Sequence, residues 1–532
     1  VYYLKSIETS THIALFVLSK RADGMEANTE DQTEGDLTGT DALYKLDEIR
    51  LFAKSNPCEV IKTVHFEYSY ELCSGVPNFN SMYQNEGEIG NGKLTLKRIY
   101  TTHYGNYKGA FSPYEFHYPE VSTDGNPDYN NNRSDHWGTY KTSTYEDDAN
   151  IYLGNNNFNP YTNQLSDFDE DNDVDVYDTL ARNNRASAWL IREITLPSGG
   201  QIAIDYEADD YAYVQDERAK QFYKIAGFSK TVLGDVDDKL KEIIGPFTNN
   251  AYYVHVELDN QFEDDVTALD YWNNAVNNCD DIYFKTYMKL KKPVAETSPV
   301  FDYVNGYAKL DTNSFDGEDL DMVYEDVDGK WYGIVPIKTH DVSQPINPIK
   351  LAGLNHLRYE RPDLFKYDEL NGMAVPALIL QLLGLIPESL SLMTGYINMA
   401  KIRGWCNEVD IENTDYPSFL RLYNGDGQKF GGGHRVKQIT ISDEWSAMSD
   451  SEENTAEYRL NYQYTLADGK TSSGVAAYEP RTGGEENALK EVKRYKAGIV
   501  SVDKQLWLEY PMNENLYPEA NVGYSRVQVQ ST

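Results

Sequence analysis

Cysteine is scarce in this sequence, which contains four among 532 residues. Cys58, Cys73, Cys279 and Cys406 show no CxxC or Cys/His spacing of the kind that holds zinc. Along one strand, the about 15 extended residues from Cys58 to Cys73 would span roughly 50 Å, so these two could form a disulfide only across a hairpin. The sequence therefore encodes no disulfide framework, and its cysteines leave the redox compartment open.

Basic residues and long apolar runs are also few. The sequence has 48 Lys and Arg residues and 85 Asp and Glu residues, which gives a formal net charge of -37. Such a chain repels nucleic acid and anionic membrane surfaces, so we expect neither as a partner. The longest apolar run, 373–386, is shorter than the ~20 residues that span a bilayer, so we expect a buried helix and no membrane insertion. The chain opens at Val1 in a strand-like pattern without a secretory leader, which suggests a fragment.

Familiar catalytic motifs are missing. There is no HExxH, no GxxxxGK[ST], no GxSxG, and no GxGxxG between a strand and a helix. The nine histidines are scattered without a spacing that would place two on one face. With 85 acidic residues, pairs of carboxylates at glycosidase separation arise by chance, so no catalytic residue and no cofactor is assigned. We expect a protein that is not an enzyme.

Tyrosine is abundant, and apolar residues often alternate with polar ones. The excess of 43 Tyr residues over 18 Phe residues is typical of sheets whose aromatic faces are partly exposed to solvent. Val64, Phe66, Tyr68, Tyr70 and Leu72 alternate with polar residues, which predicts a strand with one face on a core and one toward water. The turn at 197–200 between alternating segments predicts a hairpin. Similar patterns predict strands at 252–258 and 282–290, and a hairpin turn at 328–329.

Helical periodicity replaces this alternation in one stretch. Apolar residues at helical spacing occupy 348–361 and 373–405, and Pro348 stands where a first-turn proline would. Pro376 and Pro387 divide the second part into shorter helices. We therefore expect a mainly β fold, an extended antiparallel sheet assembly of Rhs-like or multi-sheet form with a helical insert near 347–405. The predicted regions are 1–187, which carries a long acidic loop rich in Asn, Asp and Tyr, the hairpin region 188–346, the insert 347–405, and the β region 406–532.

An acidic segment in the long loop is a candidate cation site. Alternating carboxylates on a loop can converge on calcium, which takes six to eight oxygen ligands. Val174 and Leu180 stand where an EF-hand loop needs Gly and Glu, so EF-hand geometry does not apply. A calcium site and a plain solvated loop both remain open. The candidate calcium ligands are Asp167, Asp169, Asp171, Asp173, Asp175 and Asp178.

Glycine and tryptophan supply two further hypotheses. The run at Gly431, Gly432 and Gly433 could cradle an anion, but it precedes a strand, so we expect a bulge beside another backbone. Four tryptophans could stack on sugars in a glycan-binding module, although aromatic residues of β proteins more often fill a core. These tryptophans are Trp137, Trp189, Trp331 and Trp445.

Seven short phrases occur in a characteristic order. Together they resemble the region that precedes the YD repeats in large bacterial Rhs-like proteins. The phrases are GKLTLK at 92–97, SPYEFHY at 112–118, SDHWGTY at 134–140, LPSGGQI at 196–202 followed by DYE at 205–207, GGGHRVK at 431–437, SGVAAYEP at 473–480 and VGYS at 522–525.

The resemblance implies a β-rich segment of a very large exported polypeptide, located outside the cell or on the bacterial surface. Relatives in this group form strand-built shells around a C-terminal toxin, or act as adhesive structures. This chain lacks tandem YD repeats and a toxin-like catalytic set. We therefore expect a structural or interaction segment, whose partners are other segments of the same polypeptide or cell-surface proteins. A glycan- or calcium-dependent binding module and a glycoside hydrolase are the alternatives.

Overall fold

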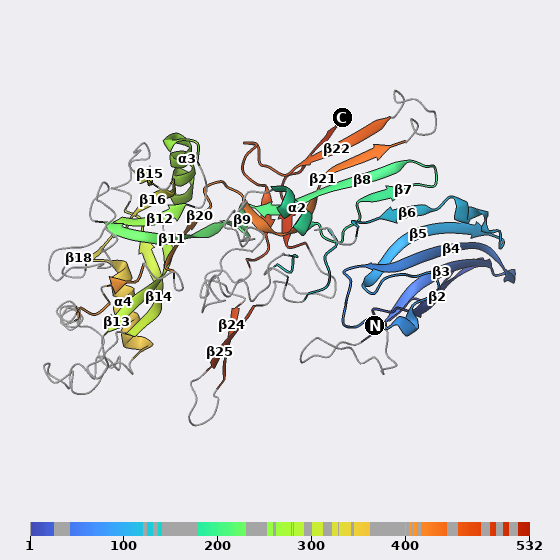
Figure 1. The fold of residues 1–532 in the computed structure, drawn as a ribbon, viewed down its shortest axis with the longest axis horizontal. Coiled ribbons are helices and arrows are strands. Elements are labelled where there is room, and N and C mark those ends of the chain that lie inside the picture. The colour runs from blue at the N-terminus through green and yellow to red at the C-terminus, as the bar shows by residue number, and fades with distance from the viewer. Residues whose placement is uncertain are drawn as a thin grey trace.

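A computed structural model gives the fold of most of the chain. It describes residues 2–25, 43–120, 125–130, 133, 137–140, 179–229, 253–258, 262–277, 279, 281–291, 300–311, 322–327, 329–341, 345–361, 400, 404–406, 408–411, 417–443, 456–479, 490–495, 504–509 and 520–532. Figure 1 shows an elongated molecule with a large sheet at each end and a small sheet between them.

The larger sheet has eleven strands, and every neighbouring pair in it is antiparallel. Eight of its strands follow one another in chain order before the sheet continues with β21, β22 and β27. In spatial order the strands are β1 (Ser6–Glu8), β2 (His12–Lys20), β3 (Tyr44–Ala53), β4 (Asn56–Leu72), β5 (Lys93–His103), β6 (Tyr114–His117), β7 (Glu193–Thr195), β8 (Gln201–Tyr211), β21 (Lys429–Ser442), β22 (Glu457–Gln463) and β27 (Gln528–Ser531).

The two faces of this sheet differ in chemistry. Strand register places a row of apolar side chains on one face, from β2 to β22, and all of them are half-buried. We call this set the apolar row: Phe16, Ile49, Val64, Phe66, Ile99, Phe116, Ile194, Ile202, Ile204, Ile439 and Leu460. The opposite face carries charged partners in register, and Arg98 there contacts Glu67 at 3.0 Å and Glu115 at 3.2 Å. This is the one-face pattern that the alternation at 64–72 predicts.

The second large sheet lies within residues 220–423, which we call the inserted unit. Its main hydrophobic core draws every residue from this range, as does a smaller cluster of three aromatic residues. In spatial order its strands are β14 (Val300–Lys309), β13 (Asp281–Lys291), β20 (Phe419–Tyr423), β11 (Lys220–Ser229), β12 (Tyr253–Leu258), β16 (Trp331–Pro336) and β15 (Val323–Glu325), with β19 (Glu408–Val409) beside β13. Helices α3 (Asp265–Val276) and α4 (Pro348–Tyr359) pack on this sheet, and α3 contributes the fully buried Trp272.

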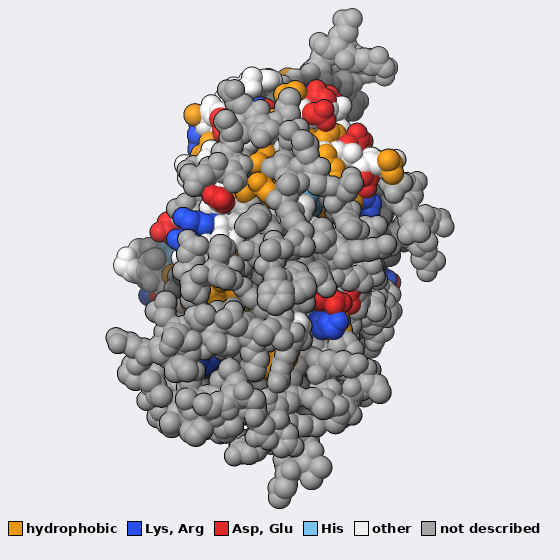
Figure 2. Space-filling view, turned by 90° about the vertical axis from the view of Figure 1, so that its left-hand side faces the viewer, with side chains coloured by type: hydrophobic (Ala, Val, Ile, Leu, Met, Phe, Trp, Pro, Cys, Tyr) orange, Lys and Arg blue, Asp and Glu red, His pale blue; other side chains and the backbone are white. Residues whose placement is uncertain are grey.

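The inserted unit joins the larger sheet through two neighbouring chain segments. Strands β8 and β21 are paired in one sheet, and their continuations β11 and β20 are paired in the other. The pairing stops at Tyr211 with Lys429 and resumes at Lys220 with Tyr423. We call the intervening segments, 212–219 and 424–428, the joint. The unit therefore sits at the end of a long antiparallel ribbon. On its outer end, described acidic and basic side chains are interspersed (Figure 2).

A four-stranded sheet includes two strands of the joint, and short elements complete the structure. This sheet consists of β10 (Glu217–Arg218), β9 (Tyr213–Val214), β23 (Gly474–Ala476) and β26 (Val522–Tyr524), and its β9–β23 pair is parallel. Two-stranded pairs are formed by β17 (His340–Asp341) with β18 (Pro345–Ile346) and by β24 (Lys490–Tyr495) with β25 (Lys504–Glu509). The remaining elements are η1 (Ser81–Tyr83), η2 (Tyr107–Phe111) and α2 (Thr179–Ala186).

The predicted fold class is confirmed, because the structure is mainly β with large antiparallel sheets and few helices. The hairpin at 197–200 forms between β7 and β8, with Gly199 at a φ of +87°. Helix α4 begins at Pro348, where the Asn347 side chain accepts from the Ile349 amide and caps the helix. Within the rest of the predicted helical insert, residues 362–399 and 401–403 lie outside the described residues. Among the described residues, no helix is long and apolar enough to cross a bilayer.

Candidate functional site

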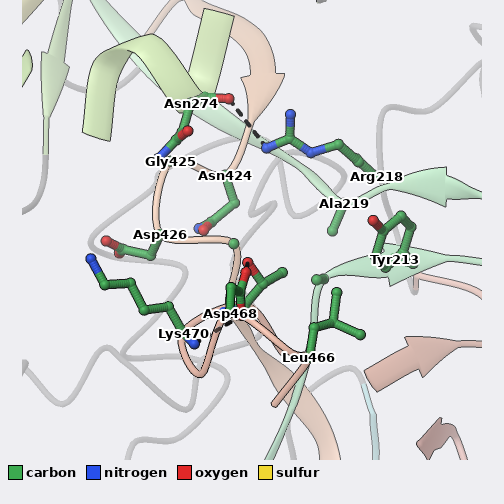
Figure 3. Close-up of a pocket in the computed structure, with 13 residues that line it drawn as sticks. Tyr213, Arg218, Ala219, Asn274, Asn424, Gly425, Asp426, Leu466, Asp468 and Lys470 are labelled. Atoms are coloured by element: carbon green, nitrogen blue, oxygen red, sulfur yellow. Dashed lines mark hydrogen bonds between the residues drawn. The ribbon is translucent and has the colours of Figure 1, made fainter. Parts of the chain in front are cut away.

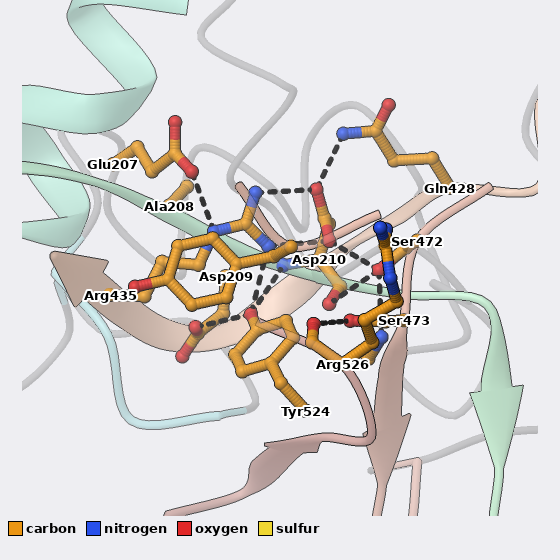
Figure 4. A network of polar contacts seen from close by, with 12 residues as sticks. Glu207, Ala208, Asp209, Asp210, Gln428, Arg435, Ser472, Ser473, Tyr524 and Arg526 are labelled. Atoms are coloured by element: carbon orange, nitrogen blue, oxygen red, sulfur yellow. Dashed lines mark hydrogen bonds and ion pairs between the residues drawn. The ribbon is translucent and has the colours of Figure 1, made fainter. Parts of the chain in front are cut away.

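The most densely bonded polar cluster lies where β8, β21 and β26 meet (Figure 4). We call it the polar junction. At its centre the Arg435 guanidinium, on β21, binds both carboxylate oxygens of Asp210, at 2.5 and 2.8 Å. Its Nε donates to Glu207 at 2.7 Å, and the ring of Tyr464 lies 4.5 Å from the guanidinium carbon. Such a bidentate, charge-assisted contact fixes the two strands in one orientation.

Tyr524 links a second carboxylate to this cluster. Its hydroxyl accepts from Arg435 at 2.9 Å and donates to Asp209 at 2.6 Å. Burial raises the pKa of Asp209 to about 6, because the site disfavours the charged form more than Tyr524 and Arg435 stabilise it. Asp210 also accepts hydrogen bonds from Gln428, in the joint, and from Ser472, just before β23. The carboxylate therefore connects three parts of the chain.

A buried ion pair lies next to the junction, at the edge of the joint. The Lys429 ammonium contacts Glu479 and donates to the Lys220 carbonyl at 2.9 Å. Tyr211 donates to the same carboxylate at 2.7 Å. Burial alone would raise the pKa of Glu479, but the opposing charges of Lys429 and Arg421 hold it below its ordinary value. Glu479 therefore remains ionised and ties β21 to the start of the inserted unit.

The glycine run explains how β21 fits between the closely packed side chains next to the polar junction. Gly431, Gly432 and Gly433 have φ values of +146°, +111° and +125°, and the pairing of β21 with β8 shifts register across them. A Cβ on Gly431 would lie 2.4 Å from Nε1 of Trp137, and one on Gly432 would lie 2.4 Å from a methyl of Val522. The predicted bulge is confirmed. The run makes room for neighbouring side chains rather than for a bound anion.

Two of the tryptophans proposed as sugar platforms are buried, which overturns that role for them. Trp137 is 8% exposed and packs in a small core with Tyr211 and Val522, and Trp331 is 3% exposed in the core of the inserted unit. Trp189 is half-buried, and its indole donates to the Pro127 carbonyl. Trp445 lies outside the described residues. Aromatic packing, which the sequence could not separate from ligand stacking, accounts for the first two.

The predicted calcium ligands lie outside the described residues. Asp167, Asp169, Asp171, Asp173, Asp175 and Asp178 all fall within the range 141–178, which the structure does not describe, so calcium stays a prediction. Within the described ranges, no group of three or more His, Cys, Asp or Glu side chains is placed to hold a metal ion. The structure joins none of Cys58, Cys73, Cys279 and Cys406 in a disulfide.

One contact of the inserted unit resembles part of a nucleophile–base pair. Nε2 of His255 lies 2.7 Å from the Ser229 hydroxyl, and Nδ1 lies 3.0 Å from the Tyr324 hydroxyl. His255 and Ser229 are each 1% exposed, and burial lowers the pKa of His255 to about 4. A substrate in solution cannot reach this pair, so we interpret it as a hydrogen-bonded contact inside the core.

The described surface includes cavities on the eleven-stranded sheet and at the joint. A groove of about 660 Å³ lies on the charged face of the eleven-stranded sheet and is lined by six acidic residues. Several of these carboxylates already contact basic side chains of the chain: Glu48 with His65, Glu67 with Arg98, Glu71 with Lys97 and Glu88 with Lys45. The second cavity, of about 410 Å³, lies at the joint (Figure 3).

Sequence comparison adds no relative, since no family model and no curated protein matches the chain. The resemblance to Rhs-like proteins therefore stays a prediction. Five of its seven phrases lie close together in the structure. Trp137, Glu207, Arg435, Glu479 and Tyr524 belong to five different phrases, and all of them take part in the polar junction, its neighbouring ion pair or the small core.

Proposed function

We propose that this chain is a structural and interaction segment of a large exported bacterial polypeptide, and that other segments of that polypeptide cover its eleven-stranded sheet. The observation that carries the proposal is the apolar row. It crosses the sheet from β2 to β22, yet each of its side chains is only half-buried. The core clusters of the described residues include none of them.

A sheet with one apolar face reaches a stable state by packing that face against a second layer. Apolar surface that continues across many strands marks a place where further polypeptide binds. β2 strengthens this interpretation. Its residues Ile13, Leu15 and Val17 face one side and Ala14 and Phe16 face the other, and all five are half-buried. Strands that are apolar on both faces are typical of sheets that are covered on both sides.

The polar junction supports a structural role from a different direction. Glu207, Asp210 and Tyr524 occupy the Arg435 guanidinium, and the Lys429 ammonium is bound by Glu479. Charged side chains whose hydrogen-bonding groups are bound within the protein hold strands together rather than bind a substrate. A rigid junction between two sheets suits a scaffold that must keep its shape.

Hydroxyl-radical footprinting tests the proposal on two samples, the isolated chain and the polypeptide as its own cells produce it. Oxidation of Phe66, Ile99 and Phe116 should fall several-fold in the cell-produced sample, because the covering segments exclude solvent from the apolar row. Tyr100 and His65, on the charged face, serve as the matched control and should change less. Equal oxidation of the apolar row in both samples would refute the proposal.

A further inference from the structure

The joint cavity is assembled by segments that are far apart in the sequence. Tyr213 and Arg218 come from β9 and β10, Asn424 from the turn before β21, Asn274 from α3, and Lys470 from the turn before β23. Figure 3 shows these side chains arranged around a common space. The volume of about 410 Å³ falls within the range of about 300–1,000 Å³ that small-molecule sites occupy. The cavity therefore exists only when the inserted unit and the sheets are correctly joined.

The polar groups of this cavity are held in place by other contacts. Nη2 of Arg218 donates to the Asn274 carbonyl at 3.2 Å, while the guanidinium lies over the Tyr423 ring at 4.5 Å. The Asn424 amide donates to Gln221 at 2.6 Å, and its oxygen accepts from the Gln428 amide at 3.2 Å. Side chains that are already ordered lose little conformational entropy when a ligand binds.

The turn opposite Arg218 is fixed in the same way. The Asp468 carboxylate accepts from the backbone amides of Lys470 and Thr471 and from the Thr471 hydroxyl. These bonds lower the pKa of Asp468, so it is ionised at neutral pH. Gly427, at a φ of +64°, lets the facing turn come within contact distance of Thr471.

The charges of the lining select the ligand class. Arg218 and Lys470 are balanced by Asp426 and Asp468, so neither an anion nor a cation gains from the cavity as a whole. Amide, carboxylate, guanidinium and hydroxyl groups present both donors and acceptors, while Tyr213 and Leu466 supply apolar surface. A neutral ligand with many hydroxyl groups and an apolar ring face matches this combination.

We infer that the joint cavity is a binding site for a neutral sugar unit, held between the inserted unit and the turn at 466–471. This site goes beyond the proposed structural role, and it places the glycan hypothesis on residues other than the tryptophans. A bound sugar would contact α3 through Asn274 and the C-terminal sheets through the turn. Binding should therefore also stiffen the joint.

Isothermal titration of the whole chain with neutral trisaccharides tests this inference. Maltotriose, cellotriose, xylotriose and N,N′,N″-triacetylchitotriose are the neutral probes, and trigalacturonate represents the acidic class. We expect saturable binding of at least one neutral probe, and about tenfold weaker binding after Arg218→Gln or Lys470→Ala, because each removes a hydrogen bond from a charged donor. Arg459→Gln, an exposed charge change on β22, is the matched control and should bind as the parent does.

Thermal unfolding of each variant separates loss of the site from loss of the fold, and Lys470 lies on an exposed turn where substitution leaves the sheets intact. In the parent chain, hydrogen exchange at 424–428 should slow when the sugar binds. Three results would overturn the inference: no saturable binding of any neutral probe, binding of the acidic probe alone, or binding that Arg218→Gln and Lys470→Ala leave unchanged. None of these results bears on the covering of the apolar row, which footprinting tests separately.

Discussion

The inserted unit and the polar junction are held together by different physics. Among its described residues, the unit has a core of thirty-five buried side chains that are almost all aliphatic or aromatic, including Trp272, Phe284 and Met288 at 0% exposure. The junction, a few residues away along β8 and β21, relies on one guanidinium, several carboxylates and a tyrosine. Burial of apolar side chains stabilises a fold without requiring specific bond directions. A buried network of ion pairs and hydrogen bonds is stable only when its donors and acceptors have one particular arrangement. The chain uses the first for a self-contained fold and the second for a connection.

The largest expected effect lies in the apolar core. Trp272→Ala should lower the stability of the inserted unit by about 4 kcal/mol, because it removes a fully buried indole and leaves a cavity against Gly333. Native-state hydrogen exchange should show the loss in β11, β12 and β16. If β8 and β21 lose as much protection as these strands, the inserted unit and the polar junction do not unfold separately. The proposed difference between the two regions would then be wrong.

Removing the central charge of the junction should cost about 3 kcal/mol. Arg435→Met leaves the buried Asp210 carboxylate, whose side chain is only 4% exposed, without its bidentate partner. The loss of hydrogen-exchange protection should appear in β8, β21 and β26 rather than in the inserted unit. Arg459→Met, which removes an exposed guanidinium from β22, is the control and should change stability little.

Acid should weaken the inserted unit. Burial lowers the pKa of His255 to about 4, below the ordinary histidine value of 6.5. The stability that the neutral ring contributes is complete above pH 6.5 and is lost as the pH falls toward 4, because the unfolded chain binds the proton more readily. Exchange of β12 should show a loss of about 2 kcal/mol over this window. His255→Phe should flatten the profile, and an unchanged profile would contradict the assignment to His255.

The Asp209 contribution should have the opposite sign at the junction. Burial raises its folded pKa to about 6, above the ordinary value of 3.8. Tyr524 and Arg435 oppose this shift, while Asp210 and Glu207 add to it. The contribution of Asp209 is therefore complete below about pH 4 and is lost as the pH rises through 6, by about 2 kcal/mol. Because Glu479 titrates in the other direction, the Asp209→Asn variant must be subtracted from the parent profile. The parent-minus-variant difference in unfolding free energy should therefore fall as the pH rises from about 4 through 6, and a difference that rises over this window would contradict the assignment.

The smallest effect is expected in the apolar row. Phe66→Ala should lower the stability of the isolated chain by about 1 kcal/mol, because the ring is half-buried and much of its surface already meets water. Urea unfolding measures the change. A loss as large as that of Trp272→Ala would mean that the row is already packed as a core, which would remove the need for a covering segment.

The sequence predicts local structure well here because local structure has local causes. The alternation from Val64 to Leu72, the glycines at 199–200 and the capped proline at Pro348 each act within a few residues, and β4, the β7–β8 hairpin and α4 follow from them. The bulge at 431–433 was predicted for the same reason. The tryptophans show the limit, since an aromatic side chain fits a core and a sugar platform equally well until its neighbours are known.

The junction and the joint could not be predicted in this way. Asp210 and Arg435 are 225 residues apart, and nothing between them announces that β8 will pair with β21. One signal was available: Asp209 and Asp210 interrupt the apolar alternation of β8 just where the strand becomes buried. Two adjacent acids inside a strand require a basic partner, but a single sequence does not say which of its 48 Lys and Arg residues supplies it.

The ribbon that carries the inserted unit has a consequence for how this molecule can be rebuilt. Lys220 and Tyr423 are paired, so both ends of a segment of about two hundred residues lie one strand spacing apart, about 5 Å. A segment whose two ends are neighbours can be deleted and replaced by a tight turn, or exchanged for another folded domain. Strands β8 and β21 would remain paired with each other in either case.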